Sequence, residues 1–305
     1  MSGLVFRLVG AHSHSHDNID WNAHLERLRA ADDFIAPDVT EVVAKLLRPG
    51  AHSAIEIGAG AGGTAAILAK GLARNGDEPQ LTIVDTAEQL LTAAGERASE
   101  ATEGVTVRTV RADAAADTLA EEITAAGAPP QADLVYAAFV VHHLPDQLAG
   151  LRRLAGLVKP GGRLAVVEFG LQTRVLPADI GIGGPGLEAR LISASEQWFQ
   201  QMRTEMDDSV RLPMGWPKAM TEAGLVEATS FSYLIDRPAP LDESGRAAAL
   251  RQLSMLRRDA DERLAAEDVE ALDQLLDPDS EHYAGSRDDL YYLSANTVHL
   301  GTKPT

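Results

Sequence analysis

A glycine-rich run that begins at Glu56 has the residue types and the spacing of a nucleoside-binding loop. Three of its glycines, Gly58, Gly60 and Gly63, fit the G-x-G-x-x-G spacing of dinucleotide-binding loops. The run also fits a spacing in which an acid precedes three alternating glycines: Glu56, Gly58, Gly60 and Gly62. Both patterns bring backbone close to a nucleoside, which only residues without a Cβ permit. A helix N-terminus favours a pyrophosphate, whereas the carboxylate of Glu56 favours a ligand that carries positive charge.

Two further acids stand where later apolar runs end. Asp85, followed by Thr86, comes 23 residues after Gly62, and Asp113, followed by Ala114, ends the next run. An acid at the first of these positions can accept hydrogen bonds from both ribose hydroxyls, in NAD sites as well as in other nucleoside sites. The alternative role for both aspartates is to cap a helix at a strand-to-helix turn.

A second group of candidates surrounds the next two runs. Ala138 and Phe139 end the fourth run, His142 and His143 follow it, and Glu168 ends the fifth. An imidazole at such a place can take a proton from an acceptor group, and a carboxylate can orient it. A base is needed only if the acceptor is a neutral hydroxyl or a similarly protonated group. The alternative for the histidines is packing or hydrogen bonding of the loop that carries them.

This ordered set of motifs resembles the class I S-adenosylmethionine-dependent methyltransferases, in particular the branch of ubiquinone/menaquinone-type and small-molecule natural-product enzymes. The resemblance covers roughly residues 53–169 and, more weakly, 216–233. It implies S-adenosylmethionine as the cofactor, with Glu56 at its amino-acid end, Asp85 at the ribose and Asp113 at the adenine amino group. The cofactor-binding residues that it implies are Glu56, Gly58, Gly60, Gly62, Asp85, Thr86, Asp113, Ala114, Ala138 and Phe139.

The catalytic candidates are His142, His143 and Glu168. Similar sugar O-methyltransferases use a histidine at the first of these positions together with a carboxylate at the end of the fifth strand. The histidine pair also occurs in relatives that methylate carbon, so the pair alone does not establish O-methylation. We predict methylation, at oxygen, of a small secondary-metabolite acceptor. Two alternatives are a non-methylating reaction such as cyclisation on the same fold, and an NAD(P)-dependent oxidoreductase.

The elements that position these residues alternate along the chain. Strands are predicted at 53–57, 80–84, 105–111, 133–139 and 163–169, with helices at 64–73, 88–98, 118–126 and 147–157 between them. Later helices are expected near 188–206 and 216–223, and later strands at 226–235 and 290–300. The predicted fold is α/β, with a doubly wound, mostly parallel seven-stranded sheet and helices on both faces. The active site is expected at the carboxyl ends of the strands.

The chain is expected to divide into four parts. Residues 1–48 are expected to form a flexible N-terminus and a helical lid, in which Pro37 divides two helices. Residues 49–169 are the cofactor-binding core, and 170–213 are an insertion that covers the substrate. Residues 214–305 complete the sheet and carry a helical insertion at 241–276, read as a solvated helical pair rather than a partner-binding surface.

Composition excludes several classes of protein. With 27 basic and 45 acidic residues the net charge is −18, which disfavours a nucleic acid as partner. The sequence has no cysteine, which removes disulfides and thiolate metal sites. Arg7 interrupts the only apolar N-terminal run, and no apolar stretch is long enough to span a membrane, so a cytoplasmic protein is expected. The sequence is compatible with a homodimer. No metal site is predicted, and the histidine tract at 12–16 is read as mobile rather than as a metal ligand set.

Overall fold

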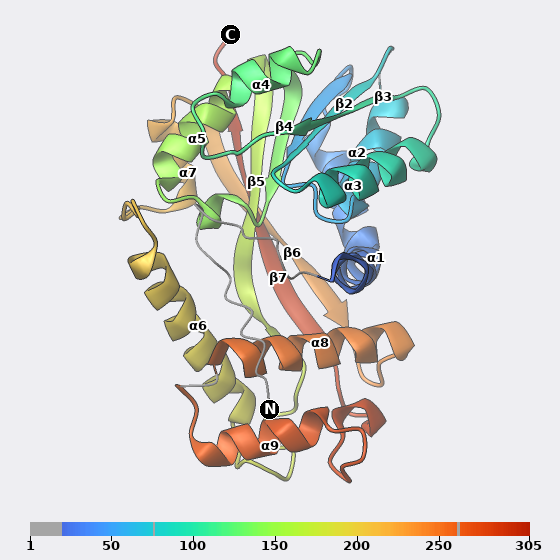
Figure 1. The fold of residues 1–305 in the computed structure, drawn as a ribbon, viewed down its shortest axis with the longest axis vertical. Coiled ribbons are helices and arrows are strands. Elements are labelled where there is room, and N and C mark those ends of the chain that lie inside the picture. The colour runs from blue at the N-terminus through green and yellow to red at the C-terminus, as the bar shows by residue number, and fades with distance from the viewer. Residues whose placement is uncertain (1–19, 76, 261–262) are drawn as a thin grey trace.

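The computed structural model describes residues 20–75, 77–260 and 263–305 and has a seven-stranded mixed sheet at its centre (Figure 1). The strand order is β3-β2-β1-β4-β5-β7-β6. The first five strands are parallel, and β7 runs antiparallel to both of its neighbours. The predicted fold class is therefore confirmed. The strands are β1 Ser53–Ile57, β2 Gln80–Asp85, β3 Thr106–Arg111, β4 Ala132–Ala138, β5 Val158–Arg174, β6 Val226–Arg237 and β7 Tyr292–Thr302.

Helices cover both faces of this sheet. The central strands β1 and β4 are mostly apolar because both of their faces are largely buried, as in other parallel sheets. One core packs helices α4 Leu119–Ala125, α5 Gln147–Gly156 and α7 Trp216–Glu222 on one face. The other core packs α1, α2 Gly63–Ala73 and α3 Glu88–Ala101 on the opposite face. The strand order reverses between β1 and β4, which in such folds is the place where a ligand crevice opens.

The N-terminal segment corrects one prediction. Helix α1 runs unbroken over Trp21–Leu46 and has Pro37 inside it, whereas two helices were expected. An internal proline removes one backbone hydrogen bond and costs about 3 kcal/mol. The last turns of α1 bury Val39, Val42 and Val43 against α2 and α3, and burying side chains of this kind contributes about 1.5–3 kcal/mol each. Tertiary packing therefore outweighs the local effect of the proline.

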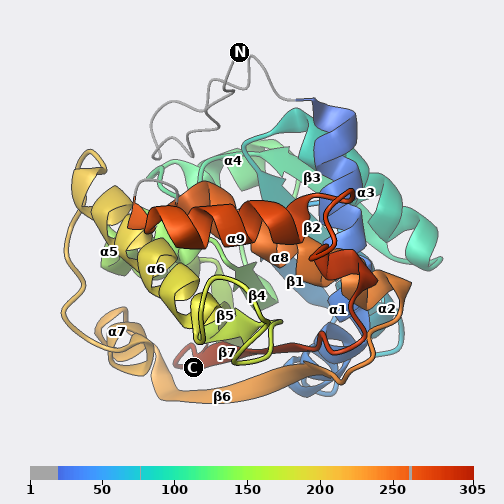
Figure 2. The ribbon, with the colours of Figure 1, turned by 90° about the horizontal axis from the view of Figure 1, so that it is seen from below.

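A third core lies beyond the carboxyl ends of the parallel strands. It is formed by α6 Leu187–Glu205, α8 Glu243–Ala260 and α9 Ala266–Leu276 (Figures 1 and 2). We call these three helices the cap. Leu253 of α8 and Leu272 of α9 are fully buried with Leu191 of α6. The expected helical pair exists, but its inner faces form a core with the 170–213 insertion instead of being solvated. The division of the chain into a helical lid, a cofactor-binding core, an insertion that covers the substrate and a C-terminal part stays a prediction.

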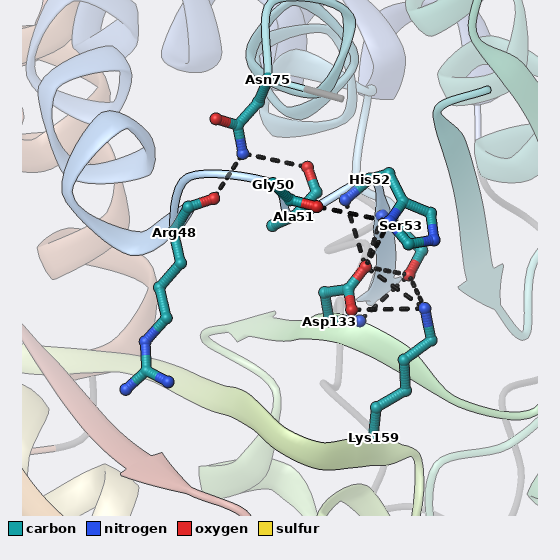
Figure 3. A network of polar contacts seen from close by, with 8 residues as sticks. All are labelled: Arg48, Gly50, Ala51, His52, Ser53, Asn75, Asp133 and Lys159. Carbon is teal, nitrogen blue, oxygen red and sulfur yellow. Dashed lines mark hydrogen bonds and ion pairs between the residues drawn. The ribbon is translucent and has the colours of Figure 1, made fainter. Parts of the chain in front are cut away.

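The opposite end of the sheet is held by a polar network (Figure 3). The Asp133 carboxylate accepts hydrogen bonds from the backbone N–H groups of His52 (3.1 Å) and Ser53 (3.0 Å) and from the Ser53 hydroxyl (2.7 Å). Lys159 Nζ adds an ion pair at 3.3 Å. This network joins the amino ends of β1, β4 and β5, so its role is structural.

Candidate active site

The glycine loop leaves β1 at the point where the strand order reverses. Gly58, Gly60 and Gly62 all have positive φ angles, of +83°, +50° and +82°. A Cβ at Gly62 would lie 2.5 Å from the backbone Cα of Ala94 in α3, so only glycine fits there. A Cβ at Gly60 would meet no atom within 4 Å. The loop thus packs tightly on its protein side and leaves open space at Gly60, as a loop that receives a ligand must.

Glu56 lies in β1 just before this loop and is 2% exposed. Its Oε2 atom has no hydrogen-bond partner among the described residues. Burial, together with the nearby carboxylates of Asp32 and Asp85, raises the pKa of Glu56 well above its usual value. A buried carboxylate without a partner is costly unless a donor or a cation reaches it. The arrangement therefore suits a ligand with a positively charged group, such as an ammonium.

Helix α1 also contributes to this loop, which was not expected from the sequence. Asp32 of α1 accepts a hydrogen bond at 2.9 Å from the backbone N–H of Gly63, where α2 begins. Arg97 of α3 donates to the same carboxylate at 3.2 Å and also pairs with Asp33. Burial raises the pKa of Asp32, while the contacts with Gly63 and Arg97 act in the opposite direction. No motif links residue 32 to the glycine loop, so only the packing of α1 on α2 reveals the contact.

The two aspartates at the ends of β2 and β3 also hold backbone. Asp85 accepts from the N–H groups of Ala59 (2.8 Å) in the glycine loop and Ala87 (2.9 Å) before α3. Asp113 accepts from the N–H of Ala115 at 2.8 Å. Each carboxylate oxygen has two lone pairs, so both side chains retain acceptor capacity for a ligand hydroxyl or amino group. The capping role and the binding role are therefore compatible.

The neighbours of these aspartates have simpler surroundings. The Thr86 carbonyl accepts a hydrogen bond from Arg111 Nε at 3.1 Å, and Ala114 is buried. At the end of β4, Ala138 pairs with Val167 of β5. Thr86, Ala114 and Ala138 all lie at or shortly after the carboxyl ends of parallel strands.

Phe139 adopts an uncommon backbone conformation at the carboxyl end of β4. Its φ is +57°, although it is not glycine, and its N–H donates to the carbonyl of Val167 at 2.9 Å. Its ring lies 5.0 Å from that of Phe169. A bulky residue in the left-handed region is uncommon, and such conformations cluster at functional sites. This backbone reversal turns the chain into the short helix that carries the histidines.

The structure brings His142 and Glu168 together. Nδ1 of His142 lies 2.5 Å from Glu168 Oε2, and the backbone N–H of His142 donates to Oε1 at 3.2 Å. Both side chains are buried. A carboxylate at Nδ1 favours the tautomer with the proton on Nδ1, which leaves Nε2 as the acceptor. No hydrogen bond to Nε2 is found within the described ranges.

The second histidine has a different position. His143 belongs to the same one-turn helix, η1 Val141–His143, but its side chain is exposed. Its ring centroid lies 4.0 Å from that of His142, and Glu168 contacts His142 instead. The pair therefore divides into one buried imidazole held by a carboxylate and one imidazole at the surface.

Two further observations concern classes of site that were considered from the sequence. In the part of the chain that the structure describes, no three His, Asp or Glu side chains form a metal-binding group. None of the described helices combines the length and the apolar character needed to cross a bilayer. The histidine tract at 12–16 and Arg7 lie outside the described residues.

Comparison with known proteins agrees with this site. A family model described as a methyltransferase domain matches residues 55–164, which run from β1 into β5 and include the glycine loop and both histidines. A highly reducing polyketide synthase of Alternaria alternata is 31% identical over 117 residues. That match covers 37% of this chain and only 4% of the much longer synthase.

The fold is shared with a solved structure. A Bacillus halodurans protein to which methyltransferase activity is ascribed shares 15% identity, with a TM-score of 0.50 over 88% of this chain and 100% of the other. Phosphoethanolamine N-methyltransferase 2 of Haemonchus contortus, solved with S-adenosylhomocysteine, shares 14% identity over 95% of this chain and 61% of its own, with a TM-score of 0.46.

The chain has the α/β fold of the class I methyltransferases. With the family match, residues 55–164 are a methyltransferase domain whose cofactor is S-adenosylmethionine. The resemblance found in the sequence is confirmed at this level. Its assignment to the ubiquinone/menaquinone and natural-product branch stays a prediction.

Proposed function

We propose that the protein transfers a methyl group from S-adenosylmethionine to a hydroxyl oxygen of a small apolar acceptor, with His142 as the general base. The observation that carries this proposal is the buried His142–Glu168 pair, which leaves Nε2 without a partner among the described residues. His142 follows β4, whereas Glu168 lies within β5, which continues to Arg174 instead of ending at 169 as expected, because its later residues pair with β7. A secondary-metabolite acceptor is supported by the stretch similar to a polyketide synthase.

The residues present fit the cofactor. The unpartnered Oε2 atom of Glu56 would receive its ammonium, and the open space at Gly60 would admit its nucleoside. Asp85 and Asp113 would accept from the ribose hydroxyls and the adenine amino group. A net charge of −18 also favours a small molecule over a nucleic acid as acceptor.

The bound sulfonium would supply an electrophilic methyl group with a good leaving group. His142 Nε2 would accept the hydroxyl proton as the oxygen attacks, because a neutral hydroxyl is a weak nucleophile. Glu168 would stabilise the imidazolium that forms, through its 2.5 Å contact with Nδ1. Holding the acceptor in line beside this base would supply much of the remaining acceleration.

Aromatic side chains around His142 support an apolar acceptor. Phe169 is 59% exposed, and its ring lies 5.2 Å from the imidazole. Phe199 of α6 lies 5.6 Å from it, edge-on. A large exposed aromatic side chain beside a candidate base suits an apolar ligand that covers it. The same rings would exclude water from the reacting groups.

The test is the rate of S-adenosylhomocysteine formation with a panel of small hydroxyl-bearing acceptors. His142→Ala should lower turnover by about 10²–10⁴-fold with little change in cofactor affinity. Glu168→Gln should cost a related amount, and the double variant should be non-additive because the two residues act as a unit. His143→Ala is the matched control and should stay close to wild type. Full activity of His142→Ala would leave proximity and desolvation as the mechanism, and product without S-adenosylhomocysteine would indicate a non-methylating reaction.

A further inference from the structure

Helix α6 contacts the loop that carries His142 with two residues one turn apart. Arg203 Nη1 donates to the carbonyl oxygens of His142 (3.1 Å) and Leu144 (2.7 Å), and Nη2 donates to that of Pro145 (3.3 Å). Phe199, four residues earlier, places its ring edge-on to the imidazole of His142. Residues four apart lie on the same face of a helix. One face of α6 therefore holds both the backbone and the ring of the candidate base.

Arg203 uses its guanidinium in an unusual way. It forms no ion pair with a carboxylate in the described part of the chain, and three of its hydrogen bonds go to backbone carbonyls of a single loop. Burial lowers the pKa of Arg203, so its charge is partly removed from water. A planar guanidinium with several fixed donors can hold three carbonyls in one geometry, which a flexible single donor cannot.

The other end of α6 is anchored in the cap. Arg190 of α6 makes two hydrogen bonds to Asp268 of α9, at 2.8 and 2.7 Å, and Asp268 is 2% exposed. Glu188 accepts a hydrogen bond at 2.6 Å from the backbone N–H of Val175, just after β5. An α-helix rises 1.5 Å per residue, so these anchors lie roughly 20 Å along α6 from Arg203. A single helix thus connects the cap core with the base.

We infer that α6 sets the position of the catalytic base, with Arg203 as the positioning residue for His142. The inference rests on the proposed function, because it concerns the base of that reaction. The insertion at 170–213 then does more than cover the acceptor. Its helix holds the His142 loop so that Nδ1 meets Glu168, and a displacement of the cap would move the base. Misplacing a reacting group by about 1 Å can cost roughly 10²-fold in rate.

The test compares Arg203→Met and Arg203→Lys with Thr204→Ala. Thr204 is the next residue of α6 and is exposed, and its hydroxyl donates to the carbonyl of Gln200 at 2.9 Å. Arg203→Met should lower kcat by about 10–100-fold, with cofactor affinity within about twofold of wild type. Arg203→Lys should lie in between, and Thr204→Ala should match wild type. In a His142→Ala background, Arg203→Met should have little further effect.

Two readouts separate positioning from a general loss of stability. The first readout is kinetic: kcat should fall in Arg203→Met while cofactor affinity stays close to wild type, whereas a general loss of stability would not separate the two. The NMR signal of the Nδ1 proton of His142 should shift or broaden in Arg203→Met and stay unchanged in Thr204→Ala.

An Arg203→Met protein with a lower melting temperature but wild-type kcat and a wild-type His142 signal would overturn the inference. Additive losses in the double variant with His142→Ala would also overturn it. If Arg203→Met does not fold, Phe199→Leu keeps an apolar side chain on the same face and should weaken the same NMR signal. Because the NMR readout does not depend on turnover, it decides the positioning role even if His142→Ala proves fully active and the proposed function fails.

Discussion

Replacing Glu56 by Gln should make the protein without cofactor more stable. The carboxyl group of Glu56 is 2% exposed, and burial raises its pKa well above the usual 4.5. Between the pKa of the unfolded chain and that of the folded protein, the unfolded chain has released a proton that the folded protein retains. The free energy of unfolding therefore falls as pH rises through this range, by about 1.4 kcal/mol per pH unit. Glutamine removes this slope, so the gain should grow with pH.

The same substitution should weaken cofactor binding. A hydrogen bond to a charged group contributes about 1.5–3 kcal/mol, which corresponds to a loss of roughly 10- to 100-fold in affinity for S-adenosylmethionine. Because the cation favours the ionised form of Glu56, the wild-type affinity should rise with pH, and the variant should lose this dependence. The two effects have opposite signs, as expected for a residue that lowers stability in favour of binding.

Urea unfolding of the cofactor-free protein at several pH values measures the first effect. Titration calorimetry in two buffers of different ionisation enthalpy measures the affinity and the protons released. Glu188→Gln is the matched control. Burial also raises the pKa of Glu188, but this residue lies at the start of α6, and its carboxylate accepts from the backbone N–H groups of Val175 and Leu176, so this variant should keep its cofactor affinity. A Glu56→Gln protein that is less stable than wild type at alkaline pH and binds the cofactor normally would refute the reasoning.

Three other outcomes follow from the same structure. Asp85→Ala should weaken cofactor binding by more than about 1 kcal/mol in calorimetric titration, and unchanged affinity in a folded variant would restrict Asp85 to holding the glycine loop. Gly62→Ala should lower the free energy of unfolding by about 1–3 kcal/mol, whereas Gly60→Ala should chiefly reduce cofactor affinity. Equal losses of stability in the two variants would contradict the difference in space around Gly60 and Gly62. Burial alone would raise the pKa of Asp133, but its hydrogen bonds and Lys159 hold it below the usual value, so its stabilisation is lost as pH falls. Asp133→Ala should cost about 1–3 kcal/mol in denaturant unfolding at neutral pH and much less in acid, without changing cofactor affinity.

Much of the fold could be predicted from local pattern. Strands buried on both faces must be continuous apolar runs, and the helices between them must be amphipathic, so β1, β2 and β4 were predicted to within a residue or two of their bounds. The glycine loop could also be recognised, because left-handed backbone at Gly62 with no room for a Cβ admits only glycine. Parallel strands bring their carboxyl ends together, which is why Glu168 and the histidines could be expected at one site.

The tertiary structure decided what depends on contacts between distant segments. The short helix after β4 buries His142 and exposes His143. The two histidines are neighbours in the sequence, which does not show which of them is buried. Helix α1 continues through Pro37 because the packing of its last turns outweighs the proline. Asp32 and Arg203 reach the site from helices that carry no recognisable motif. Local propensities fix which residues face the core, whereas contacts between a side chain and backbone 31 or 61 positions away depend on how whole helices pack against the sheet.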